Sequence, residues 1–171
     1  GWTKAEKKEY ALALEIGKAV SASCGITTDW TGAAREPDAL LTKMIDLADE
    51  TCAEPWFCVP HLADEAFISE MATLIHERLA PGRRVWVEHS NEVWNGQFAQ
   101  ATYARQQGKS QGLSQNDFEA QLFFFSRRSV ESFKLWRSAF GADKDRVVRV
   151  MAAQAGNAWV AEQVLSHNNG A

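Results

Sequence analysis

Cysteine is scarce in this chain of 171 residues, and Cys24, Cys52 and Cys58 show no Cys-x-x-Cys spacing. A zinc knuckle and a dithiol redox motif are therefore not expected, and at most one disulfide could form within the chain. The cysteine count leaves both a reducing and an oxidising compartment open.

Long apolar runs and an excess of basic residues are also missing. No stretch of 18 apolar residues occurs, so we expect no membrane-spanning helix. The net charge is −4 and lysine and arginine form no stripe, which argues against nucleic acid as a partner. Gly-rich phosphate loops and His-x-His or His-Glu-x-x-His spacings are absent from the sequence, so we expect no nucleotide cofactor and no metal.

Aromatic residues, in contrast, are abundant, with seven Trp and nine Phe. Tryptophan is common in protein cores, but a surplus is also typical of carbohydrate-binding clefts. The apolar fraction of 46% and the charged fraction of 23% are those of a globular domain with a sizeable core.

Apolar periodicity predicts strands that alternate with helices. Helices are predicted over residues 4–22, from Pro37 onward, and over 64–80, 97–107, 118–140 and 157–167; strands over 55–61, 84–90 and 146–152; and loops over 23–37 and 108–114. Alternation of this kind indicates parallel βαβ units. Three strands cannot close a barrel, so the predicted fold class is α/β, as part of a (β/α)8 TIM barrel or as a small open sheet. The aromatic run 122–125 is interpreted as helix core.

The most informative segment runs from Val85 to Asn95, where a short strand leads directly into Glu, Asn, Glu and Trp. A carboxyl group beside an amide and an indole suits sugar chemistry, because its pKa can be tuned and the indole offers a flat face to a sugar ring. Strand alternation places Glu88 and His89 on opposite faces of the sheet. The plain alternative is a strand followed by a solvated loop that Trp94 anchors.

This segment, together with residues 55–64, resembles secreted bacterial glycoside-hydrolase-like proteins with a TIM-barrel fold. They are similar to the clan of retaining glycosidases whose fourth barrel strand ends in Asn-Glu. In that clan the strand reads Glu-x-x-Asn-Glu, which Glu88, Asn91 and Glu92 match, although the proline that often follows is Val93 here. The resemblance covers residues 37–167. It implies that Glu92 is the general acid/base, that Asn91 contacts the sugar 2-hydroxyl, and that the protein is extracellular or periplasmic and acts on a polysaccharide or oligosaccharide.

Barrel enzymes carry their chemistry at the carboxyl ends of the strands, where His61, Glu92 and Gln154 all fall in the predicted order of elements. We therefore expect His61, Trp94 and Gln154 to bind substrate, with Asn157 as a weaker candidate.

Each candidate has a structural alternative. Glu92 could be an exposed or salt-bridged carboxylate, Asn91 a cap of the following turn, His61 a hydrogen-bonded structural histidine and Trp94 a core residue. For Glu88, an ion pair with an arginine competes with a role in the site.

A retaining glycosidase needs a second carboxylate about 5 Å from the first. In the clan this nucleophile ends the seventh strand, and no Asp or Glu ends the strand predicted over 146–152. We therefore expect residues 37–171 to be a piece of a larger barrel, with residues 1–36 unassigned. Such a piece would be inactive alone, would self-associate through open sheet edges, and would have the remaining barrel segments as its partner. The alternative function is a non-catalytic carbohydrate-binding or scaffold module.

Overall fold

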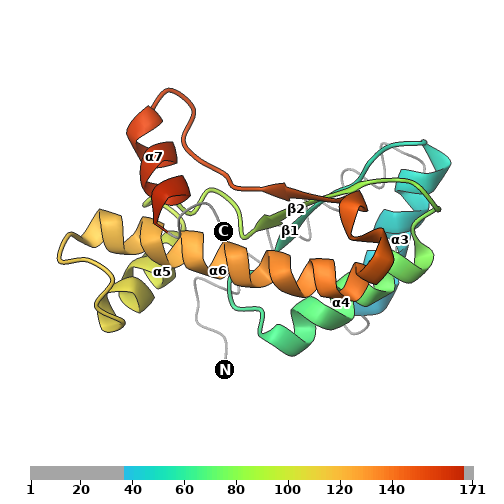
Figure 1. The fold of residues 1–171 in the computed structure, drawn as a ribbon, viewed down its shortest axis with the longest axis horizontal. Helices are drawn as coiled ribbons and strands as arrows, with labels where there is room; N and C mark the ends of the chain where they lie inside the picture. The colour runs from blue at the N-terminus through green and yellow to red at the C-terminus, as the bar shows by residue number, and fades with distance from the viewer. Residues whose placement is uncertain (1–36, 168–171) are drawn as a thin grey trace. The chain divides into compact units, whose positions relative to one another are not determined.

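Three parallel strands lie side by side in the order in which they occur along the chain (Figure 1). The computed structural model describes residues 37–167. Their elements are α3 (Pro37–Glu50), β1 (Trp56–Val59), α4 (Glu65–Arg78), β2 (Val85–His89), α5 (Ala99–Ser110), α6 (Asp117–Phe140), the 3-10 helix η1 (Gly141–Arg146), β3 (Val147–Val150) and α7 (Ala158–Ser166). The sheet and helices α4 to α7 belong to the second of two units, which starts at Ile45. The prediction of an α/β fold with parallel strands is confirmed.

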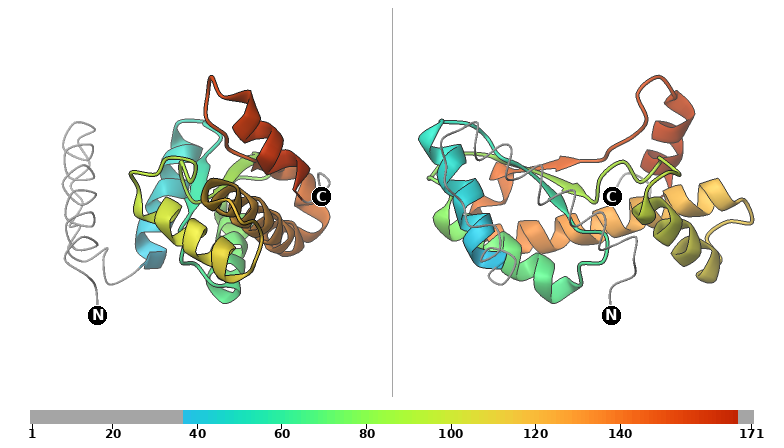
Figure 2. Two further views of the ribbon diagram at one scale, coloured as in Figure 1. Left: turned by 90° about the vertical axis from the view of Figure 1, so that its left-hand side faces the viewer. Right: turned by 180° about the vertical axis from the view of Figure 1, so that it is seen from behind.

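One face of the sheet is buried beneath α4 and α6, as Figures 1 and 2 show. Alternate residues of the strands point to this face, and α4 packs its apolar stripe against it. The buried side chains are Phe57 and Val59 of β1, Val85 and Val87 of β2, Val147 of β3, and Ile68, Ala72 and Ile75 of α4. This layer is the main core.

The helices of residues 37–167 leave the opposite face of the sheet largely uncovered (Figures 1 and 2). Trp56 of β1 is 54% exposed there, Cys58 is exposed, and their register partners on β2 are Trp86 and Glu88. The prediction of a buried strand over residues 55–61 is therefore right for one face only. Parallel sheets usually have both faces covered, so this face and the free edges of β1 and β3 are unusual within residues 37–167.

The helix boundaries follow from capping. The carboxylate of Asp64 accepts from the backbone N–H of Phe67 (2.8 Å) and starts α4. The side chain of Asn116 accepts from two backbone N–H groups and starts α6. Gly141, with φ of 52°, ends α6, because a residue with a Cβ rarely adopts that conformation. The helices predicted over 64–80, 118–140 and 157–167 are confirmed.

Helix α5 extends further than predicted. The loop prediction for residues 108–114 is wrong at its start, because α5 continues through Gly108 to Ser110. A Cβ on Gly108 would lie 2.5 Å from the carbonyl carbon of Ala120 on α6, and closer still to its oxygen. Gly108 is therefore a contact point at which the backbones of α5 and α6 touch, rather than a helix breaker.

A second apolar cluster joins the turn after β2 to α5, α6 and α7. Its buried members are Val93, Ala104, Leu122, Phe124, Phe125, Val160 and Val164. The interpretation of residues 122–125 as helix core is confirmed. The helix and loop predicted within residues 1–36 lie outside the described residues.

Candidate functional site at the carboxyl ends of β1 and β2

The turn that follows β2 has an unusual backbone. Ser90 has φ of 63° and Glu92 has φ of 47°, so both lie in the left-handed region. Left-handed backbone costs a residue with a Cβ about 1–2 kcal/mol. Asn91, whose residue type tolerates this region best, lies between them and has no positive φ. The turn is therefore held in this shape by its surroundings.

Hydrogen bonds from three other elements supply that support. The Val59 carbonyl of β1 accepts from the Ser90 backbone N–H (2.6 Å). Gln100 of α5 donates its Nε2 to the Asn91 carbonyl (2.7 Å), and Gln121 of α6 donates its Nε2 to the Val93 carbonyl (2.7 Å). Backbone strain persists where the surrounding structure over-determines it, and such places are enriched at functional sites.

The turn presents Glu92 and Asn91 to solvent. Glu92 is half-buried, and its carboxylate accepts from the Asn95 side chain (Nδ2 to Oε2, 3.2 Å). The backbone N–H of Asn95 also donates to the Glu92 carbonyl (2.8 Å). Asn91 is exposed. Glu92 is therefore oriented by a neighbouring amide and remains accessible to a ligand.

Glu88 is the buried carboxyl group of this region, with 5% of its surface exposed. The Cys58 Sγ lies 4.0 Å from its Oε2. Burial raises the pKa of Glu88 and the charge of Glu92 raises it further, against the opposing influence of the Trp56 indole and the Glu92 backbone. Among residues 37–167 no arginine forms an ion pair with Glu88, so the alternative of an ion pair finds no support there.

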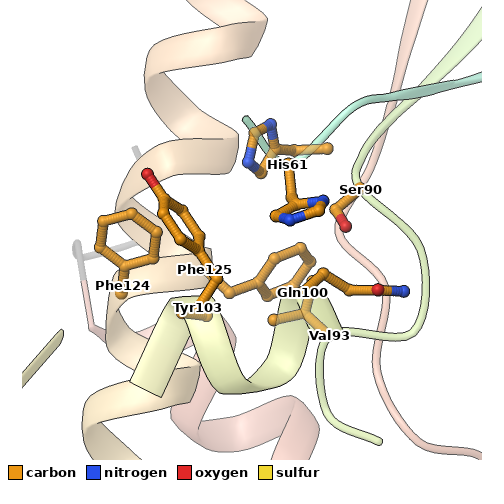
Figure 3. A pocket seen from close by; sticks show the side chains of 9 residues that line it. His61, Ser90, Val93, Gln100, Tyr103, Phe124 and Phe125 are labelled. Carbon is orange, nitrogen blue, oxygen red and sulfur yellow. The ribbon is translucent and has the colours of Figure 1, made fainter. Parts of the chain in front are cut away.

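A small pocket lies behind the turn, between the strand ends and helices α5 and α6 (Figure 3). Its volume of about 10 Å³ is room for roughly one water molecule. A sugar ring cannot enter it. The lining residues are His61, His89, Ser90, Val93, Gln100, Tyr103, Ala104, Phe124 and Phe125.

Two histidines meet at this pocket. His61 is half-buried, and its ring packs edge-on against Tyr103, with 5.4 Å between ring centroids. His89 is 2% exposed, and its Nδ1 has no hydrogen-bond partner within residues 37–167. Burial, with the nearby charges of Arg128 and His61, lowers the pKa of His89 to about 3. His89 is therefore neutral near pH 7.

The other two predicted substrate-binding residues lie in different surroundings. Trp94 is partly buried and packs against the second apolar cluster, which agrees with the core alternative. Gln154 is exposed, and its side-chain oxygen accepts from Asn157 (3.2 Å) within its own loop. The structure thus gathers His61 with the end of β2, whereas the interactions of Gln154 are local.

An exposed aromatic pair occupies the open face of the sheet. Trp56 and Trp86 stack with 6.0 Å between centroids and 22° between planes. A hydrogen bond to the Glu54 carboxylate (2.8 Å) fixes the indole of Trp86. Trp86 therefore offers Trp56 a stacking surface whose position is set before any ligand binds.

No group of three or more His, Cys, Asp or Glu side chains suited to a metal ion occurs among the residues that the structure describes. Within the same range, no helix is both long and apolar enough to cross a membrane. Cys52 and Cys58 are free thiols.

Comparisons of the chain with protein-family models, curated proteins and solved structures find no match. The functional argument therefore depends on the residues and their geometry.

Sequence reasoning missed His89, Gln100 and Tyr103 as neighbours of the site. The period-2 alternation of β2 could have placed His89 on the face of Val85 and Val87. Gln100 and Tyr103 belong to α5, whose sequence has no continuous apolar stripe and so gives little indication of which side faces the strands.

Proposed function

We propose that the chain is part of a (β/α)8 barrel and carries the acid/base half of a retaining glycoside hydrolase site. In this proposal Glu92 is the general acid/base, Asn91 binds the sugar 2-hydroxyl, and the substrate is a polysaccharide or oligosaccharide. The nucleophilic carboxylate comes from the remaining barrel segments of the parent protein, which is extracellular or periplasmic.

The observation that carries the proposal is the conformation of Glu92. Glycine would cost less than glutamate at φ of 47°. A glutamate there, oriented by Asn95 and half exposed at a strand end, is better explained by use of its carboxyl group than by folding. General acid/base catalysis needs a carboxyl group held in place with access to the glycosidic oxygen.

The sheet supports the barrel part of the proposal. Its strands are parallel and sequential, with helices on one face, and its other face and both edges are open within the described part of the chain. In a barrel the open face becomes the packed interior, and β1 and β3 pair with further strands. The site then lies at the carboxyl ends of the strands, as barrel enzymes require.

Two substitutions in the parent protein test the catalytic role. Glu92→Gln should lower the turnover of alkyl glycosides by about 10²–10⁴-fold, because their leaving oxygen needs a proton. Dinitrophenolate leaves without protonation, so the first step on dinitrophenyl glycosides should slow much less. Glu162→Gln, on the exposed surface of α7, is the matched control and should change neither. Equal losses on both substrates would contradict acid catalysis by Glu92.

The stacked pair of Trp56 and Trp86 favours one alternative, a non-catalytic carbohydrate-binding module. A half-exposed indole of fixed orientation can stack on a sugar ring. Calorimetric titration of this chain with oligosaccharides separates the two functions. If Trp56→Ala abolishes binding and Glu92→Gln and Asn91→Ala do not, the module is correct. Trp159→Ala on α7, where Trp159 is 40% exposed, is the control for loss of an exposed indole.

A further inference from the structure

A buried histidine borders the small pocket behind the turn (Figure 3). His89 is 2% exposed, and its Nδ1 has no hydrogen-bond partner within residues 37–167. A buried polar atom that stays unpaired costs the free energy of its removal from water, so native proteins rarely leave one. The Nδ1 atom therefore requires a partner other than the groups of the described chain.

The pocket has the size and the lining of a site for one small polar molecule. Its volume of about 10 Å³ matches roughly one water molecule. Val93 and Ala104 contribute apolar walls, whereas the Ser90 hydroxyl and the rings of His61 and His89 are polar groups of the lining (Figure 3). A buried water molecule typically makes two to four hydrogen bonds, and these three polar residues supply groups of that kind and number.

The charges around the pocket favour a neutral occupant. None of the lining residues is an acid, so a cation would have no counter-charge there. Burial, and after it the charges of Arg128 and His61, lower the pKa of His89 to about 3, so positive charge is disfavoured at this place. An organic anion such as acetate has too many atoms for the volume. Water suits the site because it can donate to a bare imidazole nitrogen or accept from a protonated one.

We propose that the pocket is a binding site for one water molecule, which hydrogen-bonds to His89 Nδ1 and to the Ser90 hydroxyl. This water completes the core between the end of β2 and helices α5 and α6 as a fixed part of the structure. It also restrains Ser90, the first of the two left-handed residues of the turn. The site goes beyond the proposed function and is independent of it, because no sugar has to bind for the water to be held.

Nuclear Overhauser effects between water and the His89 ring test the site in the wild-type chain. The Cε1–H of an imidazole lies next to Nδ1, so a water molecule held at Nδ1 is close to that proton. We expect a cross-peak with the sign of a contact that outlasts the tumbling of the protein. The Cε1–H of His76, whose side chain is 30% exposed on α4, is the internal control, because surface water exchanges too fast to give that sign. A His89 proton without such a cross-peak overturns the proposal.

The stability of a variant that fills the pocket provides the second measurement. Val93→Ile adds one methyl group to a lining residue, which occupies roughly the space of a water molecule. If this methyl displaces water from His89, the equilibrium constant for unfolding should rise about tenfold more than in Val164→Ile, a control in the same apolar cluster that does not line the pocket. In a His89→Leu background this excess should vanish, because no imidazole is left unpaired.

Two results of this measurement would overturn the proposal. The first is an equal effect of the two isoleucine variants. The second is a gain in stability by Val93→Ile, which is the result expected for a dry cavity that an added methyl group fills. If a variant does not fold, the cross-peak of the wild-type chain decides.

Discussion

Replacing His89 by glutamine should remove most of the loss of stability that we expect between pH 6.5 and pH 5. The folded protein holds His89 with a pKa of about 3, against 6.5 for an ordinary histidine. As the pH falls below 6.5, the unfolded chain takes up a proton at this position and the folded chain does not. The contribution of neutral His89 is therefore complete above pH 6.5 and is lost as the pH falls toward 3.

The size of the effect follows from the pKa difference. One pH unit inside this window is worth about 1.4 kcal/mol, so roughly 2 kcal/mol is lost between pH 6.5 and pH 5. His89 is 2% exposed, so solvent screens this little. Glu88 acts in the opposite direction, since its raised pKa makes the folded state the first to take up a proton there. Glu88 is present in both wild type and His89→Gln, so its contribution cancels in the difference between their free energies of unfolding.

Urea denaturation followed by tryptophan fluorescence from pH 5 to pH 7.5 measures this difference. Val93→Ala, which alters the same pocket without a titrating group, should lower stability equally at every pH. If the free energies of unfolding of wild type and His89→Gln change with pH in parallel, His89 is not buried as a neutral imidazole. The NMR signals of the His89 ring give an independent result, because they should not titrate between pH 7.5 and pH 5.

Three further predictions concern packing and reactivity. Gly108→Ala should lower the free energy of unfolding by about 2 kcal/mol in urea denaturation, because the clash of the new Cβ with the Ala120 backbone outweighs a gain of about 1 kcal/mol in helix propensity. Gly96→Ala is the control and should be close to neutral, because a Cβ there meets nothing within 4 Å. Gln121→Leu should lower the free energy of unfolding by about 1–3 kcal/mol, because it leaves the Val93 carbonyl without its donor. Gln106→Leu, at an exposed position of α5, is the control and should not lower it. Equal stabilities of the two variants would contradict the anchoring of the turn by Gln121. Desolvation by burial, with the charge of Glu88, raises the pKa of the Cys58 thiol to about 11. At pH 8 this thiol should therefore react with iodoacetamide roughly 100-fold more slowly than free cysteine, and Glu88→Gln should speed the reaction; a normal rate, read by mass spectrometry, would exclude the raised pKa.

The fold was largely predictable from the sequence for physical reasons. The strands β2 and β3 contain short runs of β-branched residues, and the helices α4 and α6 carry apolar residues at helical spacing between recognisable caps. The opposite orientations of Glu88 and His89 followed from the period of a strand. These features depend on neighbours in sequence, which a reader of the sequence can see.

The site was less predictable because its features depend on contacts between distant segments. The left-handed conformation of Glu92 has no signature in a glutamate, and its anchors come from Gln100 and Gln121 on separate helices. The orientation of α5 depends on the contact of Gly108 with Ala120. From the sequence alone, Gly108 is interpreted as the start of a loop. The buried Glu88 lies opposite Cys58 of β1, thirty positions earlier in the chain.

Several departures from local folding rules lie together between residues 88 and 92. Between residues 88 and 92 lie a buried carboxyl group, a buried histidine with an unpartnered nitrogen, and two left-handed residues that are not glycine. Other departures are scattered: Cys52 is also left-handed, and three buried polar atoms on α6 have no hydrogen-bond partner among the described residues. Proteins that follow local rules in most places break them mainly where function requires it. An inert loop at the end of β2 would need neither the strain nor the three hydrogen bonds that restrain it. Their occurrence together favours a functional site at the end of β2, whichever sugar or other ligand it binds.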